Sequence, residues 1–243
     1  MIFRRAKART VVTRLEKSLG IPKQPSHLPA PLDILIATIL SQNTNDKNSH
    51  RAYTGLRNRC GSWEEVADTP VRVIAGAIRS GGMADQKSLR IKNILHEIRE
   101  QFGRCTLDPI RRWSDERIME KLTRYSGVGP KTASCVLLFS LGRDIFPVDT
   151  HVHRICSRLQ LSSGARTPEE TFRQMGRIVP EGKRYSFHTN LIRFGRTICR
   201  SSRPRCGDCP LNDQCSYQGK TRLRIGGPPK ANHHFMLLDN VSA

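Results

Sequence analysis

The sequence lacks any hydrophobic run long enough to cross a lipid bilayer. Its longest strongly apolar stretches, residues 34–40 and 136–141, are far shorter than the roughly 20 residues that a membrane-spanning helix needs. Amphipathic membrane anchors and the apolar core of a secretory signal are absent as well. These absences exclude a membrane as the partner, and we expect a cytoplasmic location.

Acidic residues are also scarce. The 243 residues include 21 Asp and Glu against 41 Lys and Arg, which gives a formal net charge of +20. Such an excess predicts a polyanionic partner. Because membrane anchors are missing, we interpret the charge as a preference for nucleic acid, and we expect the protein to be associated with the nucleoid.

Strand-like alternation of apolar and polar residues is almost absent, and the sequence contains no internal repeat. Apolar residues instead recur at helical spacing, as in residues 89–102 and 132–141. Residues 1–9 are rich in arginine and lack acids, and we interpret them as a basic arm before a helix at residues 10–19. The fold class predicted from these patterns is all-α.

Disulfides are not expected, because the sequence has no secretory signal and thiols stay reduced inside most cells. Four of the eight cysteines are scattered, and we interpret them as small buried hydrophobic residues: Cys60, Cys105, Cys135 and Cys156. The other four lie within 17 positions near the C-terminus: Cys199, Cys206, Cys209 and Cys215. Four thiolates at this density predict a metal site, either zinc or a [4Fe–4S] cluster. A single Cys-x-x-Cys pair, in place of the two that a zinc ribbon usually has, favours the iron–sulfur cluster.

Five arginines surround these cysteines, and no acidic residue interrupts them before Asp208: Arg193, Arg196, Arg200, Arg203 and Arg205. One or two such arginines could belong to an ordinary solvated loop. Five of them on a segment tethered by a metal site would form a fixed cationic surface, which suits phosphate contacts. We therefore predict that these arginines bind DNA.

Residues 122–133, LTRYSGVGPKTA, combine the end of one helix, a glycine-rich turn and the start of another helix. Gly127 and Gly129 flank Val128 and allow a tight turn that brings backbone N–H groups close to an anion, while the next helix adds its positive dipole. The pattern is typical of a helix-hairpin-helix that binds DNA phosphate without reading sequence. A lone Gly-x-Gly also occurs in ordinary helix connections.

Two residues near this turn have side chains suited to catalysis. Lys131 lies in the first turn of the second helix, where the dipole is expected to lower the pKa of its amine and favour a nucleophile. Asp149 opens another helix eighteen residues later. Taken alone, this aspartate is also typical of an N-cap residue.

Three motifs together resemble the endonuclease III branch of the helix-hairpin-helix DNA glycosylases, the HhH-GPD superfamily. They are residues 122–133, FPVDTHVHRICSRL at residues 146–159 and the four-cysteine loop. The resemblance spans most of residues 28–217. It implies two helical domains that flank a DNA-binding cleft, a [4Fe–4S] cluster in preference to zinc, and damaged double-stranded DNA as the partner.

The domain boundaries follow from the same resemblance. We assign residues 31–143 to a helical bundle domain that contains the hairpin. Residues 1–30 and 144–217 are assigned to an iron–sulfur cluster domain, and residues 218–243 to a C-terminal tail.

The resemblance also implies roles for individual residues. Lys131 matches the family's Schiff-base lysine and Asp149 matches its catalytic aspartate. Gln42 and Asn43 match polar residues that fill the gap left by a flipped base, although they could also be the polar end of a core helix. Met83 occupies the position of an apolar wedge, where the family commonly has leucine.

We therefore predict a monomeric base-excision glycosylase with AP lyase activity, which acts on oxidised pyrimidines or abasic sites in duplex DNA. One alternative is a monofunctional glycosylase of the same fold that removes mismatched thymine, uracil or adenine. Another is a non-catalytic DNA-binding protein that uses the hairpin and a zinc knuckle only to hold DNA.

Overall fold

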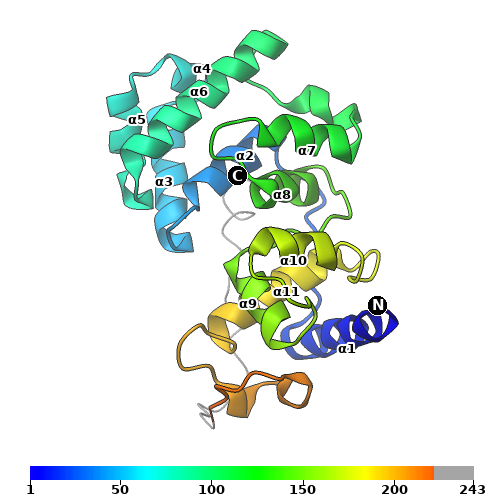
Figure 1. Cartoon of the computed structure of the whole chain (residues 1–243). Coiled ribbons are helices and arrows are strands. Elements are labelled where there is room, and N and C mark those ends of the chain that lie inside the picture. The colour runs from blue at the N-terminus through cyan, green and yellow to red at the C-terminus, as the bar shows by residue number, and fades with distance from the viewer. Residues whose placement is uncertain (222–243) are drawn as a thin grey trace. The chain divides into compact units, whose positions relative to one another are not determined.

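The computed structural model of the chain describes residues 1–221 (Figure 1). The predicted all-α class is confirmed, because every regular element among these residues is a helix. The α-helices are α1 (Ile2–Leu19), α2 (Pro31–Leu40), α3 (Asp46–Arg59), α4 (Trp63–Asp68), α5 (Val71–Ala77), α6 (Ala84–Phe102), α7 (Asp115–Thr123), α8 (Pro130–Ser140), α9 (Thr150–Arg158), α10 (Pro168–Met175) and α11 (Arg184–Thr197). The short 3-10 helices are η1 (Arg79–Gly81), η2 (Asp108–Arg112), η3 (Cys206–Asp208) and η4 (Asn212–Gln214). The expected tail, residues 218–243, lies outside the described residues from position 222 onward.

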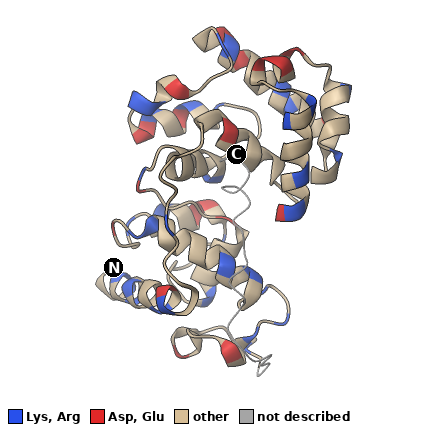
Figure 2. Cartoon of the chain, turned by 180° about the vertical axis from the view of Figure 1, so that it is seen from behind, with Lys and Arg blue, Asp and Glu red and all other residues tan. Residues whose placement is uncertain are grey.

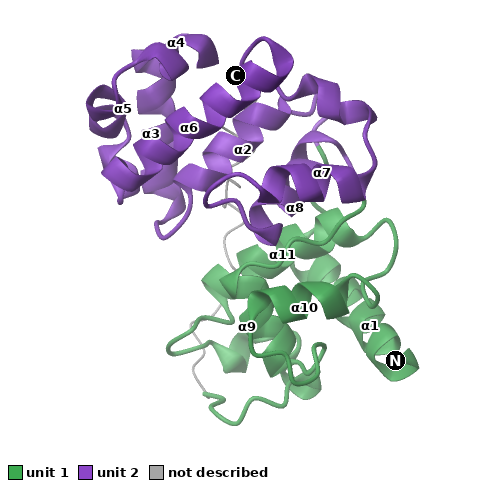
Figure 3. Ribbon diagram, turned by 45° about the horizontal axis from the view of Figure 1, so that its top comes forward, with its two compact units in different colours: residues 1–24, 144–233 green, residues 25–143, 234–243 purple. Residues whose placement is uncertain are grey.

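The chain divides into two compact units, which are coloured separately in Figure 3. Of the described residues, unit 1 contains 1–24 and 144–221, and unit 2 contains 25–143. The first boundary therefore precedes the position of residue 31 that the sequence suggested. A hydrogen bond of 2.6 Å from Ser140 Oγ in α8 to the carbonyl of Pro29 ties the segment before α2 to unit 2.

Basic residues lie on the helices of both units and outnumber acidic residues (Figure 2). Of the arginine-rich residues 1–9, expected as an arm, residues 2–9 are instead part of one continuous helix, α1. Ala8 and Val11 of this helix are fully buried, so its apolar stripe extends into the arginine-rich segment and keeps that segment helical. No helix in the described part of the chain is both long and apolar enough to cross a membrane.

α2 is the central helix of unit 2. Nine of its ten residues are buried, and it packs against α8, α3 and α6. The exception is Asp33, whose carboxylate accepts hydrogen bonds from Tyr53 Oη (3.1 Å) and Trp63 Nε1 (2.8 Å). Burial raises the pKa of Asp33, and these two hydrogen bonds oppose that shift. One carboxylate therefore holds α3 and α4 against α2.

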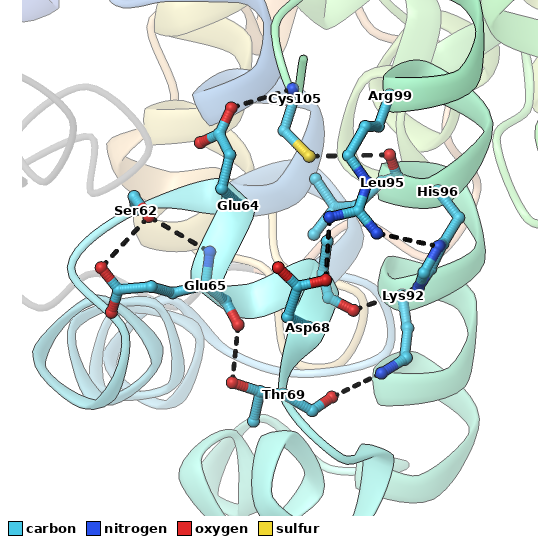
Figure 4. A network of polar contacts seen from close by, with 11 residues as sticks. Ser62, Glu64, Glu65, Asp68, Thr69, Lys92, Leu95, His96, Arg99 and Cys105 are labelled. Atoms are coloured by element: carbon cyan, nitrogen blue, oxygen red, sulfur yellow. Dashed lines mark hydrogen bonds and ion pairs between the residues drawn. The ribbon is translucent and has the colours of Figure 1, made fainter. Parts of the chain in front are cut away.

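A second polar network joins α4 to α6 (Figure 4). Lys92 Nζ donates to the carbonyl of Thr69 at 2.7 Å, and Arg99 forms a 2.8 Å ion pair with Asp68. These contacts lie along the middle and the C-terminal half of α6. The N-terminal turn of α6 contacts the end of α2 instead.

Unit 1 is organised around α11, which packs against α1 and α9. The rings of Phe146 and Phe187 stack with centroids 5.3 Å apart, and Asn190 Nδ2 donates to the carbonyl of Gly20 at 2.9 Å. Because Phe146 lies just before α9, its packing on α11 fixes the point at which α9 begins.

Replacing Asp33 with alanine removes the acceptor of two buried donors. Each unsatisfied buried donor costs roughly 1–3 kcal/mol, so we expect the free energy of unfolding, measured by urea titration, to fall by about 2–6 kcal/mol. The matched control is Asp68→Ala, which breaks an ion pair whose aspartate side chain is 67% exposed. That change is expected to alter stability by less than about 1 kcal/mol. Equal losses in the two variants would show that the Asp33 hydrogen bonds do not stabilise unit 2.

Candidate active site and cysteine cluster

The glycine-rich turn between α7 and α8 leaves the start of α8 without a capping side chain. Gly127 has a φ of 75°, and Gly129 is the N-cap residue with Pro130 directly after it. Val128 is 4% exposed and donates its N–H to the carbonyl of Tyr125 at 3.0 Å. First-turn N–H groups have no intrahelical acceptor, so this helix end can bind an anion through its backbone.

The turn is tied to the end of α2 through Gln42. Gln42 Nε2 donates to the carbonyl of Gly127 at 3.0 Å, and its Oε1 accepts a hydrogen bond from Arg90 Nη1 at 3.2 Å. A Cβ at Gly127 would overlap the Arg90 guanidinium. The left-handed backbone therefore favours glycine at position 127, and a side chain there would displace the Arg90 guanidinium.

The structure places Asn43 and Met83 beside Gln42, on neighbouring segments of unit 2. Asn43 Nδ2 lies 3.6 Å from Met83 Sδ. The Met83 side chain is 50% exposed. Both residues have left-handed backbones, with φ of 53° at Asn43 and 51° at Met83.

A buried lysine that the sequence analysis did not single out lies behind these two segments. Lys87, in the first turn of α6, is 1% exposed. Its ammonium donates to the carbonyls of Leu40 (2.9 Å), Gln42 (2.7 Å) and Gly81 (2.9 Å). Burial lowers the pKa of Lys87. Helical periodicity could have predicted that Lys87 is buried, because residues 87, 91, 94 and 98 lie on the buried stripe of α6.

Lys131 lies in the first turn of α8 and is partly exposed. Unlike Lys87, it forms no hydrogen bond or ion pair with any residue in the range 1–221. Within these residues, its amine therefore has no carbonyl partners like those that hold Lys87 in place.

Asp149 is the N-cap residue of α9. Its Oδ1 accepts a hydrogen bond of 2.8 Å from the N–H of Val152. Asp149 therefore has the local geometry of an N-cap residue, which is one of the two roles that the sequence suggested. Asp149 belongs to unit 1, whereas Lys131 belongs to unit 2.

α9 also holds the cysteine loop through two arginines. Arg154 Nη2 donates to the carbonyls of Cys199 (2.9 Å) and Gly195 (3.1 Å). Arg158 Nη1 donates to the carbonyl of Arg200 (2.7 Å) and lies 3.3 Å from the sulfur of Cys199. The helix that begins at the candidate aspartate therefore ends against the first cysteine.

The four C-terminal cysteines line one small pocket of about 20 Å³. Backbone N–H groups of Leu211 and Tyr217 donate to the sulfurs of Cys209 (3.4 Å) and Cys215 (3.5 Å). Burial raises the pKa of Cys209 to about 12, so its thiol keeps its proton at neutral pH unless a metal displaces it. No three His, Cys, Asp or Glu side chains in residues 1–221 are arranged to hold a single metal ion.

The scattered cysteines are buried, as predicted: Cys60, Cys105, Cys135 and Cys156. Each lies apart from the pocket that the other four line.

The five arginines near the cysteine loop do not form one uniform surface. Arg200 and Arg203 are exposed, whereas Arg193 and Arg196 are partly buried in α11. Arg205 is only 8% exposed and forms an ion pair of 2.7 Å with Asp208. Arg205 therefore has a structural role inside the loop, and the prediction that it contacts phosphate is not retained.

Comparison with known proteins gives the class to which this fold and hairpin belong. Residues 36–181, more than half of the chain, match the family model of the HhH-GPD superfamily base excision DNA repair proteins. Endonuclease III of Thermotoga maritima is 34% identical over 197 residues, which cover 80% of this chain and 88% of that protein. Within the HhH-GPD superfamily, the chain belongs to the endonuclease III family.

Two further comparisons extend this result. An Arabidopsis thaliana protein named as a DNA glycosylase is 36% identical over 190 residues. The match covers 74% of this chain and 64%, less than two thirds, of the plant protein. The solved structure of a non-covalent endonuclease III–DNA complex shares the fold, with a TM-score of 0.74 at 24% identity over 87% of this chain and 95% of that chain.

Gly127→Ala and Gly129→Ala form a matched pair within the hairpin. The left-handed backbone at Gly127 disfavours a side chain by roughly 1–2 kcal/mol, so we expect Gly127→Ala to lower the free energy of unfolding by at least about that amount. Gly129 has a φ of −96° and no atom near the position of a Cβ. Gly129→Ala is expected to change stability by less than about 0.5 kcal/mol. Chemical denaturation of both variants tests this, and an unaffected Gly127→Ala would contradict it.

Proposed function

We propose that the protein is a DNA glycosylase with AP lyase activity, which removes oxidised pyrimidines from duplex DNA as a monomer at the nucleoid in the cytoplasm. The observation that carries this proposal is the position of Lys131. Its amine follows directly after the glycine turn and has no polar partner among residues 1–221. An amine without such partners beside a phosphate-binding helix end is suited to attack the sugar of a bound nucleotide.

In the proposed reaction, the Lys131 amine attacks C1′ of the damaged nucleotide, and the base departs with the electron pair of the glycosidic bond. Asp149 accepts a proton from the attacking amine and stabilises the positive charge that develops on the sugar. The sugar ring then opens to an iminium ion. Loss of a proton from C2′ expels the 3′ phosphate, which cuts the strand, and water releases the lysine.

The damaged base has to leave the helix before this attack. Extrusion costs a few kcal/mol and is least costly for a damaged or mismatched base, so the lesion itself contributes to selection. We propose that Met83 enters the base stack as a wedge and that Gln42 and Asn43 fill the space left behind. The half-exposed Met83 side chain and its contact with Asn43 support this assignment.

DNA backbone contacts are proposed for the hairpin and for part of the cysteine loop. The N–H groups at the start of α8 bind one phosphate, with Gly127, Val128 and Gly129 shaping the turn. The arginines retained for further phosphates are Arg193, Arg196, Arg200 and Arg203. These contacts carry no sequence information and fix the register of the protein on the duplex.

We further propose that the four cysteines of the loop hold a [4Fe–4S] cluster. The four residues line one pocket, and the sulfurs of two of them accept backbone N–H donors, as cluster ligands commonly do. When bound, the cluster supplies a cross-link that fixes the loop and the arginines on it. Arg154 and Arg158 hold the first cysteine in place from α9.

Borohydride reduction distinguishes this reaction from base removal by water. Wild-type protein is expected to become covalently attached to duplex DNA that contains an oxidised pyrimidine, whereas Lys131→Gln should give no covalent product. Attachment is measured as a shifted band in a denaturing gel.

The matched control is Lys121→Gln in α7, which removes a lysine of the same unit and should leave trapping intact. Base release without any trapping by wild-type protein would favour the monofunctional alternative. Neither base release nor trapping on any lesion would favour a protein that only binds DNA.

Metal analysis tests the cysteine assignment. Protein purified without oxygen is expected to contain about four iron atoms per chain and to absorb visible light, and Cys206→Ser should lose most of that iron. Cys60→Ser, which alters a buried cysteine elsewhere, should keep it. One equivalent of zinc in wild-type protein, with no iron, would overturn the proposal.

A further inference from the structure

Lys87 is a buried cation that is hydrogen-bonded to backbone carbonyls. It is 1% exposed, and its three hydrogen bonds, of 2.7–2.9 Å, go to carbonyl oxygens. An ammonium group has three N–H donors, so these bonds use its full capacity. No carboxylate among residues 1–221 forms an ion pair with it. Such a group is tolerated in a protein interior only where it is fully hydrogen-bonded.

The three carbonyls belong to two different segments. Leu40 and Gln42 lie at the C-terminal end of α2, and Gly81 is the last residue of η1. Asn43 follows the first pair directly, and Met83 follows Gly81 by two positions. One ammonium group therefore holds both of the segments that carry the residues proposed to enter DNA.

Both segments have a backbone that needs such support. Asn43 and Met83 have positive φ values, a conformation that side-chain-bearing residues adopt only where the surrounding structure enforces it. The carbonyl of Gln42 precedes the amide of Asn43, so the bond from Lys87 acts on the peptide group at that turn. The same ammonium fixes the entry to Gly82 and Met83 through Gly81.

We propose that Lys87 is a positioning residue that sets the spacing between the wedge segment and the gap-filling segment. It acts through their backbones and does not touch DNA. The proposal rests on the proposed function, because it assumes that the two segments enter the duplex together. The proposal assigns Lys87 to one step of that function. Extrusion of the base needs both segments in register, whereas attack by Lys131 does not.

Two substrates in the same duplex sequence separate these steps. An oxidised pyrimidine must be extruded before base release, whereas an abasic site holds no base and can react with Lys131 directly. A misplacement of about 1 Å can slow an enzymatic step about a hundredfold, so we expect Lys87→Met to slow base release by roughly ten- to a hundredfold. Borohydride trapping at the abasic site should slow by less than about threefold, because Lys131 itself is unchanged.

The matched control is Lys92→Met on the same helix, which removes a lysine bonded to one backbone carbonyl away from both segments. Its ratio of base release to abasic-site trapping should equal that of wild type. A general loss of stability lowers both rates together, so only the ratio reports positioning. An unchanged ratio in folded Lys87→Met would overturn the proposal.

A second variant keeps the test decisive if Lys87→Met does not fold. Gly81→Ala retains the lysine but places a Cβ 3.1 Å from the Cβ of Ala52 and 3.9 Å from Lys87 Nζ, which crowds the segment that the ammonium holds. We expect it to lower the same ratio by about threefold or more, and an unchanged ratio would again refute the proposal. Failure of wild-type protein to trap an abasic site would instead refute the proposed function, which distinguishes the two ideas.

Discussion

The last carbonyl of α2 needs a hydrogen-bond donor that the neighbouring residues do not provide. The carbonyls of Ala37, Thr38 and Ile39 accept hydrogen bonds from Ser41 and Gln42, whereas the carbonyl of Leu40 accepts one from Lys87. The ammonium of Lys87 meets this need, and it places a positive charge at the negative end of the helix dipole. Because the same ammonium binds η1, satisfying one helix end also determines where a second segment begins.

Unit 1 follows the same principle with arginine. Arg154 and Arg158 donate to backbone carbonyls around Cys199, and Arg205 is neutralised within the loop by Asp208. Part of the net charge of +20 therefore stabilises irregular backbone inside the protein and is not available to DNA. Composition alone overstates the phosphate-binding surface, because it cannot separate cations that are buried against carbonyls from cations that face solvent.

These examples show why the sequence predicted some features and missed others. Periodicity predicts helices because it reflects burial of one face, and the glycines of the hairpin signal a turn because few other residues adopt its backbone. Residues 1–9 were assigned as an arm because they are rich in arginine, yet Ala8 and Val11 lie on a buried stripe that continues the helix through this segment. Arg205 was assigned to phosphate from its charge alone, whereas Asp208 pairs with it in the structure. Lys87 was missed because a charged residue was not expected in the core.

The contacts within unit 2 also explain how a nucleophile can be placed by residues that never touch it. Gln42 bonds the carbonyl of Gly127, and the Arg90 guanidinium occupies the space that a side chain at Gly127 would fill. The turn that leads into α8 is therefore fixed by the end of α2, which is in turn fixed by Lys87. Lys131 is in the first turn of α8, so Gln42 and Arg90 link its position to the end of α2. Because Lys87 bonds directly to the backbones beside Asn43 and Met83 and reaches α8 only through Gln42, its loss should act mainly on extrusion of the base and much less on attack by Lys131.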